Sequence, residues 1–138
     1  MASSGLTFAC GCVVALLLGC GAPASDLVPV SGKVTLEGRR LRHGTVSYRP
    51  GEITLPQATG ALDGEGRYRL FTGGELGAPA GEYKVVVFAY DQPTQGAGNA
   101  GLPKSVISER YHQGETTPLT REVRKDAPQG AYDLELTP

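Results

Sequence analysis

The amino-acid sequence predicts an all-β fold, a seven-stranded antiparallel Greek-key β-sandwich, and three observations support it. First, the 138 residues include 20 Gly and 10 Pro with 40% hydrophobic residues, a composition typical of short strands joined by tight turns. Second, apolar and polar residues alternate in segment after segment, as in half-buried strands. Third, no segment keeps a helical period for more than a turn or two. A chain of this length has room for one such domain.

The first half of the domain is predicted to contain four strands. Residues 28–36 and 45–49 alternate in hydrophobicity and are separated by a turn at 37–40, EGRR. A third strand at 57–62 leads through Asp-Gly-Glu-Gly into a fourth at 67–70, and the Asp-Gly pair favours a hairpin because Gly adopts positive φ at little steric cost. The residues predicted to face the core here are Val28, Val30, Val34, Leu36, Val46, Tyr48, Tyr68 and Leu70.

The second half is predicted to contain three strands, at 81–90, 119–123 and 131–136. The first of these is apolar on both faces, since Val86 and Phe88 lie opposite the inward-facing residues. Such a strand is expected at the centre of a sheet or beneath the loop that follows it. The residues predicted to face the core here are Tyr83, Val85, Val87, Ala89, Tyr132, Leu134 and Leu136.

The segment Asp91–Ser105 is an unusually long connection, rich in Gly, Asn and Gln. Loops of more than about 12–15 residues are commonly functional or disordered. Two interpretations stay open for this one. It is either a flexible surface loop or a partner-docking loop flanked by Tyr90, Tyr111 and His112.

The N-terminal segment has the pattern of an export signal. The first charged residue is Asp26, and Val13–Leu18 is apolar but shorter than the roughly 20 residues that span a bilayer. It departs from the usual pattern in having no Lys or Arg before the apolar run. We expect residues 1–19 to be removed as a signal peptide.

Cys20 ends the apolar run, and Leu17-Leu18-Gly19-Cys20 resembles the lipobox of bacterial lipoproteins. The resemblance implies cleavage between Gly19 and Cys20 and diacylglyceration of the Cys20 thiol. The mature chain would then keep a single cysteine, which cannot form an internal disulfide. A cleaved secretory signal with an incidental cysteine and an uncleaved anchor are the alternatives.

A short tether would follow the lipid. Residues 20–27 reach at most roughly 25 Å when extended, so the domain at 28–138 is expected close to the lipid surface. By resemblance to the enterobacterial sorting rule, Gly21 rather than Asp after the cysteine favours an outer membrane. The expected location is the bacterial cell envelope, lipid-anchored, at the outer membrane or facing the periplasm.

Three motifs occur in an order that resembles the carboxypeptidase regulatory-like, transthyretin-like module. They are VSGKVTLEGRRLRHGTVSYRP, ALDGEGRYRL and APAGEYKVVV. With the lipobox and LPKSVISERYHQGETTPLTREV, the chain is similar to small lipoproteins abundant in planctomycete bacteria. The resemblance implies a seven-stranded sandwich on a surface or periplasmic lipoprotein, and it implies no reaction.

Catalysis is not expected. The hydroxyisourate hydrolase among transthyretin-like folds has paired His, an Arg and a Tyr-Arg-Gly-Ser end, whereas this chain ends DLELTP and has only His43 and His112. No Ser stands beside a plausible His base in a recognisable elbow. We therefore predict no catalytic residue and no cofactor, and the two histidines are interpreted as exposed loop residues.

Two clusters are weak candidates for binding. Asp63 and Glu65, with nearby carbonyls, have the oxygen chemistry that Ca²⁺ prefers, although an Asp in this position more often caps its own turn. The basic cluster of Arg39, Arg40, Arg42 and His43 is suited to lipid head groups or an anionic polysaccharide. The alternative is a solvated hairpin tip.

The predicted function is therefore that of a non-catalytic, lipid-anchored cell-envelope protein, a structural module or one that binds protein or glycan. The net charge of −1, from 13 basic and 14 acidic residues, gives no reason to expect nucleic acid as a partner. The alternative is an accessory binding protein for a small molecule or carbohydrate, with Ca²⁺ assisting. The absence of Trp counts against a sugar site.

Overall fold

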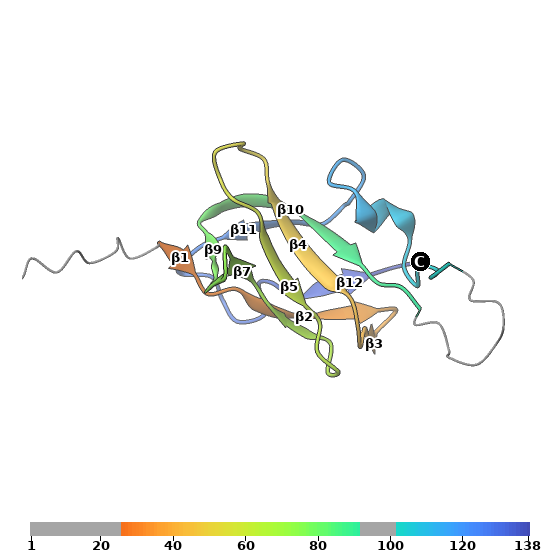
Figure 1. Ribbon diagram of the computed structural model, residues 1–138. Coiled ribbons are helices and arrows are strands. Elements are labelled where there is room, and N and C mark those ends of the chain that lie inside the picture. The colour runs from red at the N-terminus through yellow and green to blue at the C-terminus, as the bar shows by residue number, and fades with distance from the viewer. Residues whose placement is uncertain (1–25, 92–101) are drawn as a thin grey trace, which may run out of the picture.

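The computed structural model describes residues 26–91 and 102–138, which fold into strands and one short helical turn (Figure 1). The all-β prediction is confirmed. The described elements are β1 (Leu27–Val28), β2 (Ser31–Leu36), β3 (Arg39–Arg40), β4 (Thr45–Pro50), β5 (Ala58–Ala61), β6 (Arg67–Arg69), β7 (Phe71–Thr72), β8 (Glu75–Leu76), β9 (Ala78–Pro79), β10 (Gly81–Phe88), the 3₁₀ turn η1 (Glu109–His112), β11 (Thr120–Val123) and β12 (Leu134–Leu136).

Seven of these twelve strands have three or more residues, and each lies in a segment for which the sequence predicts a strand. The other five have two residues each. One of them, β3, occupies the second half of the turn predicted at 37–40. Glu37 and Gly38, with φ of 50° and 77°, form a two-residue turn between β2 and β3. Arg39 and Arg40 therefore lie in a strand rather than at a hairpin tip.

The strands form two sheets that face each other. The larger sheet has the order β11-β10-β4-β5-β7-β8, and its pairs are antiparallel. The smaller sheet contains β12, β2 and β3, with β6 also paired to β2. A separate pair, β1 with β9, lies at the end of the molecule opposite β3 (Figure 1).

One strand pair departs from the predicted antiparallel arrangement. β12 runs parallel to β2, with Leu134 beside Val34 and Leu136 beside Leu36. Parallel neighbours cannot be joined by a tight hairpin and need a long crossover connection. The chain between β2 and β12 supplies one, since it passes through the whole larger sheet before it returns. Purely antiparallel pairing was therefore the wrong expectation for this pair.

A single apolar core lies between the sheets, and the predicted inward residues occupy it. Val34, Leu134 and Leu136 come from the smaller sheet, while Val46 and Val85 come from the larger one. Leu36 is the exception among the predicted core residues, being only partly buried. The central position predicted for residues 81–90 is confirmed, since β10 pairs with β4 on one side and β11 on the other.

A chain of tyrosine hydroxyls crosses this core. The Tyr68 hydroxyl donates to the backbone oxygen of Tyr132, so the Tyr48 hydroxyl must be the donor in the 2.8 Å bond between the two phenols. The rings of Tyr48 and Tyr83 are 5.8 Å apart. Burial raises the pKa of Tyr48 to about 12 and raises the pKa of Tyr68 as well. The network joins β4, β6 and the segment before β12.

Candidate functional site

The basic cluster predicted from the sequence is not one surface in the structure. Arg39 and Arg40 are exposed in β3, and successive residues of a strand point to opposite faces, so their side chains diverge. Arg40 forms an ion pair with Glu65 of the β5–β6 turn. His43 Nε2 lies 2.7 Å from the backbone oxygen of Tyr90. Arg42 is exposed. The fold therefore gives the members of this cluster different surroundings.

Asp63 caps the β5–β6 turn, as the second interpretation of this residue requires. Its Oδ1 accepts the N–H groups of Glu65 at 2.8 Å and Arg67 at 2.9 Å. The hydrogen bond from the Arg67 backbone is the largest cause that lowers the pKa of Asp63 below its ordinary value. Nowhere in residues 26–91 and 102–138 do three or more His, Cys, Asp or Glu gather in a way that could hold a metal ion. A calcium site at Asp63 and Glu65 therefore has no third carboxylate among the described residues. It stays a prediction.

His112 was interpreted as an exposed loop residue, but it is partly buried in η1 and lies against the base of the long loop. Its ring stacks on Phe88 at 5.3 Å between centroids and lies 5.8 Å from the ring of Tyr90. Its Nε2 is 3.0 Å from Ser105 Oγ. A backbone bridge between Tyr90 and Ser105 fixes this arrangement. Most of the predicted loop, residues 92–101, lies outside the described residues.

The Ser105–His112 pair is a juxtaposition that sequence reasoning missed. Its geometry does not prepare a nucleophile, because Ser105 Oγ also donates to the oxygen of Ile107 at 2.8 Å and accepts from its N–H at 3.3 Å. A general base also needs a group that orients it, and no described carboxylate forms an ion pair with His112. The hydrogen bond between Ser105 and His112 holds η1 against the segment that precedes it.

Tyr111 was predicted as a binding residue, and the structure places it in the core instead. Its side chain is 2% exposed. Its hydroxyl accepts the N–H of Thr137 at 2.9 Å and a guanidinium N–H of Arg110 at 3.0 Å. The sequence pattern could not show this, because Tyr111 belongs to a four-residue turn with no readable period. Tyr111 is therefore unavailable to a partner at the surface.

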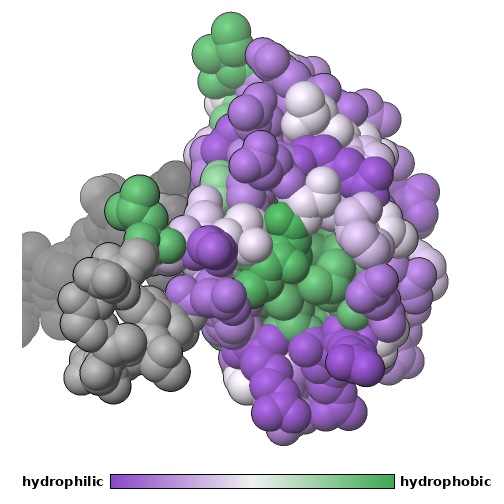
Figure 2. Space-filling view, turned by 90° about the vertical axis from the view of Figure 1, so that its right-hand side faces the viewer, coloured by the Kyte–Doolittle hydropathy of each residue, from purple (hydrophilic) through white to green (hydrophobic). Residues whose placement is uncertain are grey.

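The end of the molecule at which β3 lies carries a hydrophobic hollow with a hydrophilic rim (Figure 2). The end of β2 and the β5–β6 turn lie at this end. Leu36, the last residue of β2, and Leu62, which follows β5, are partly buried against the core. Tyr90, with 42% of its surface exposed, is the aromatic side chain most open to solvent at the loop base. A hollow of apolar character is a feature that small-molecule sites share.

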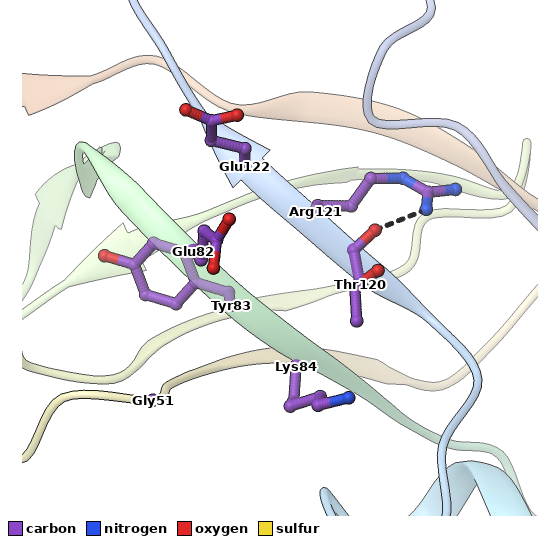
Figure 3. Close-up of a pocket in the computed structure, with 7 residues that line it drawn as sticks. All are labelled: Gly51, Glu82, Tyr83, Lys84, Thr120, Arg121 and Glu122. Carbon is purple, nitrogen blue, oxygen red and sulfur yellow. Dashed lines mark hydrogen bonds between the residues drawn. The ribbon is translucent and has the colours of Figure 1, made fainter.

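A pocket of about 360 Å³ lies over the edge strand pair of β10 and β11 (Figure 3). Glu82 and Glu122 are direct cross-strand partners, and Lys84 lies opposite Thr120. Arg121 donates to the backbone oxygen of Thr120 at 2.7 Å, drawn in Figure 3, and to that of Asp133 at 2.7 Å. Arg121 therefore links the two sheets. The pocket is lined by two carboxylates, the ammonium group of Lys84 and the side chain of Thr120.

A second and larger cavity, of about 890 Å³, lies beside β2 and β6; we name it the β2–β6 groove. The strand register pairs Ser31 with Arg69 and Lys33 with Arg67, so these four side chains share the outer face. Among the other lining residues are Phe71, Asp63 and Asp133. The sequence did not point to this groove, since Lys33 is more than thirty positions from Arg67 and Arg69 and only the register brings them together.

The predicted lipidation residue Cys20 and the cleavage residue Gly19 lie outside the described residues. Within residues 26–91 and 102–138, no helix is long and apolar enough to cross a membrane. Comparison with protein-family models, curated proteins and solved structures gives no match to this chain. Its function is therefore argued from residues and geometry.

Proposed function

We propose that this chain is a non-catalytic, lipid-anchored protein of the bacterial cell envelope, whose β-domain serves as an interaction module. One observation carries the proposal. The small residue Gly19 and then Cys20 follow directly on the apolar run Val13–Leu18, and the first strand of the folded domain begins only seven residues after the cysteine, at Leu27. A lipid at Cys20 would therefore hold the domain within roughly 25 Å of the membrane.

The finer fold assignment belongs to the same proposal. We infer a seven-stranded Greek-key sandwich of the transthyretin-like, carboxypeptidase regulatory-like type, in a lipoprotein of the planctomycete kind. The support comes from the ordered motifs in the sequence and from the seven longer strands, which fall in two facing sheets. The parallel β12–β2 pair is a feature that this assignment has to accommodate.

The absence of catalysis is also a proposal. It is supported by the engagement of Ser105 Oγ with the backbone of Ile107, which leaves its hydroxyl poorly placed to attack a substrate. We expect an activated-serine reagent such as a fluorophosphonate to leave Ser105 unlabelled. Labelling that is lost in Ser105→Ala would favour a hydrolase and contradict the proposal.

The anchor is tested by the intact mass of the protein extracted from membranes. We expect the wild-type chain to begin at Cys20 and to carry the added mass of acyl chains, which bind membranes by about 0.8 kcal/mol per buried CH₂. Cys20→Ser should lose both the cleavage and the added mass. Cys12→Ser, in the same segment, is the matched control and should behave as wild type. An unmodified wild-type chain would contradict the anchor.

A second candidate function is supported by the size of the β2–β6 groove. Its volume of about 890 Å³ falls in the range of small-molecule sites, and Phe71 at its edge is 45% exposed. An accessory protein that binds a small molecule or carbohydrate would use such a groove. Binding on a glycan array that is lost in Phe71→Ala would favour this function over a protein-binding module.

A further inference from the structure

The outer face of the β2–β6 pair concentrates positive charge. Cross-strand partners in an antiparallel pair point to the same side of the sheet, and the register sets Lys33 beside Arg67 and Arg69 beside Ser31. Lys33, Arg67 and Arg69 are all exposed and all line the groove. Three cations thus lie on neighbouring positions of two short strands.

These cations have no ionic partner among the described residues. The ion pairs there join Arg40 to Glu65 and Arg124 to Asp126. The groove also contains Asp63 and Asp133, so its formal charge is +1 from three cations and two carboxylates.

Both carboxylates are held by the backbone. Oδ1 of Asp63 accepts two N–H groups in its own turn, and Oδ1 of Asp133 accepts the N–H of Lys33 at 3.0 Å. Arg67 and Arg69 attract the charge of Asp63 and help to lower its pKa, but neither forms an ion pair with it, so their N–H donors remain available to an external anion.

The position of the groove relates it to the proposed anchor. Pro29, one of its lining residues, comes directly after β1, the first strand of the domain. The groove therefore begins nine residues after Cys20 in the sequence. The cluster at β3 lies at the opposite end of the molecule from β1 (Figure 1). The groove extends from Pro29, beside β1, to Asp63 of the β5–β6 turn, so one of its ends is near the point where the chain would leave a membrane.

The chemistry of the side chains fits phosphate. Guanidinium groups bind phosphate oxygens through paired N–H donors, and Lys supplies a compact charge beside them. Phe71, exposed next to these cations, offers an apolar ring of the kind that enters the interfacial layer of a bilayer. Cations with an adjacent exposed aromatic residue are a combination suited to a lipid surface.

We propose that the β2–β6 groove binds the phosphate head groups of anionic lipids, so that Lys33, Arg67 and Arg69 form a second membrane contact beside the anchor. The choice of a lipid over another anion rests on the proposed lipid anchor. Such a contact would orient the tethered domain, with the β3 end and its apolar hollow directed away from the bilayer. Each basic residue near an anionic surface strengthens binding by about fivefold.

The test uses the mature chain, residues 20–138 with Cys20→Ser, so that neither an acyl group nor the apolar run Val13–Leu18 contributes. It measures sedimentation of this chain with phosphatidylcholine vesicles with and without phosphatidylglycerol. We expect Lys33→Gln/Arg67→Gln/Arg69→Gln to weaken binding to the anionic vesicles about 100-fold. The matched control, Arg39→Gln/Arg42→Gln/Lys125→Gln, removes the same charge from other exposed positions and should weaken it about 3-fold or less. Arg67→Gln alone, with an expected loss of about fivefold, replaces the triple variant if that chain does not fold.

The outcomes separate this proposal from the anchor. Equal losses in the groove variant and its control would overturn the groove, as would equally tight binding to vesicles without phosphatidylglycerol. Binding of the chain to soluble alginate but not to anionic vesicles would overturn it in favour of a polysaccharide. If the intact mass shows no acylation while the groove variant still loses vesicle binding, the groove stands and the anchor fails.

Discussion

The inner and outer surfaces of the β2–β6 pair are built from alternate residues of the same two strands. Polar groups on the inner surface are hydrogen-bonded within the protein, whereas those on the outer surface face solvent. On the inner surface the hydroxyl of Tyr68 is bonded to Tyr48 and to the backbone of Tyr132. On the outer surface Arg67 and Arg69 extend into solvent without a described ionic partner. A buried polar group is costly when unpaired, whereas an exposed one is not. The residue that stabilises the core, Tyr68, and the residues that carry available charge, Arg67 and Arg69, are therefore immediate neighbours in the chain.

The largest expected effect is at Gly32, on the inner surface. A Cβ at this position would lie 2.4 Å from the oxygen of Tyr132 and 3.1 Å from the ring of Tyr68. Because the first of these atoms is backbone, β2 would have to move away from the segment before β12. We expect Gly32→Ala to lower the free energy of unfolding by about 3 kcal/mol or more, measured by chemical denaturation.

Gly64→Ala is the control for that substitution. Gly64 lies in the β5–β6 turn, and a Cβ there would meet nothing within 4 Å. Its effect should stay within about 0.5 kcal/mol. If Gly32→Ala unfolds at the same denaturant concentration as Gly64→Ala, the close approach of the two segments is absent in solution.

The next effect is expected from the tyrosine hydroxyls. Tyr68→Phe leaves both the carbonyl of Tyr132 and the hydroxyl of Tyr48 without the partner they have in the native protein, and each unpaired buried group costs about 1–3 kcal/mol. We expect a loss of about 2–3 kcal/mol. Tyr48→Phe removes only a donor and should cost about 1 kcal/mol. The reverse order would show that the hydrogen bond from Tyr68 to the carbonyl of Tyr132 is not formed in solution.

The same network predicts a decline in stability at alkaline pH. Burial raises the pKa of Tyr48 to about 12, while in the unfolded chain a tyrosine ionises near 10. A raised folded-state pKa means that the stabilisation is complete below pH 10 and is lost as the pH rises from 10 to 12. The expected loss from this residue is about 3 kcal/mol.

Denaturation at pH 9 and pH 11 in wild type, Tyr48→Phe and Tyr90→Phe checks this dependence. Tyr48→Phe should flatten the pH profile, and Tyr90→Phe, at an exposed position, should leave it unchanged. An unchanged slope in Tyr48→Phe would assign the alkaline transition to other groups.

Alternation in the sequence was enough to predict which side faces the core in five of the seven predicted strands. Tyr68 and Tyr132 were both predicted to face inward, and both are buried. The reason is that side chains alternate with a period of two along a strand, whatever the partner strand is. The position of β10 between two neighbours was also readable, because a strand buried on both faces has apolar residues at both parities.

Pairings between distant segments could not be predicted in this way. Lys33 and Arg67 meet through strand register, and Ser105 and His112 meet because the Tyr90–Ser105 bridge fixes one side of the contact. Neither relation leaves a periodic signal in one sequence. The basic cluster at 39–43 was visible because its members lie close together in the chain, but Arg39 and Arg40 are consecutive residues of a strand and diverge. Residues that are close in the chain therefore did not share a surface, whereas residues that are far apart did.

The smallest effect is expected from the ion pair between Arg40 and Glu65, on the outer side. The two side chains are 65% and 62% exposed, so solvent screens their attraction. Arg40→Gln should lower the free energy of unfolding by no more than about 0.5 kcal/mol, and a double-mutant cycle with Glu65→Gln should give a coupling of similar size that falls with added salt. A coupling above about 1 kcal/mol that persists in salt would mean that outer charges contribute to folding. In that case the groove cations could not be neutralised without cost, and stability and available charge would not be separable on this pair of strands.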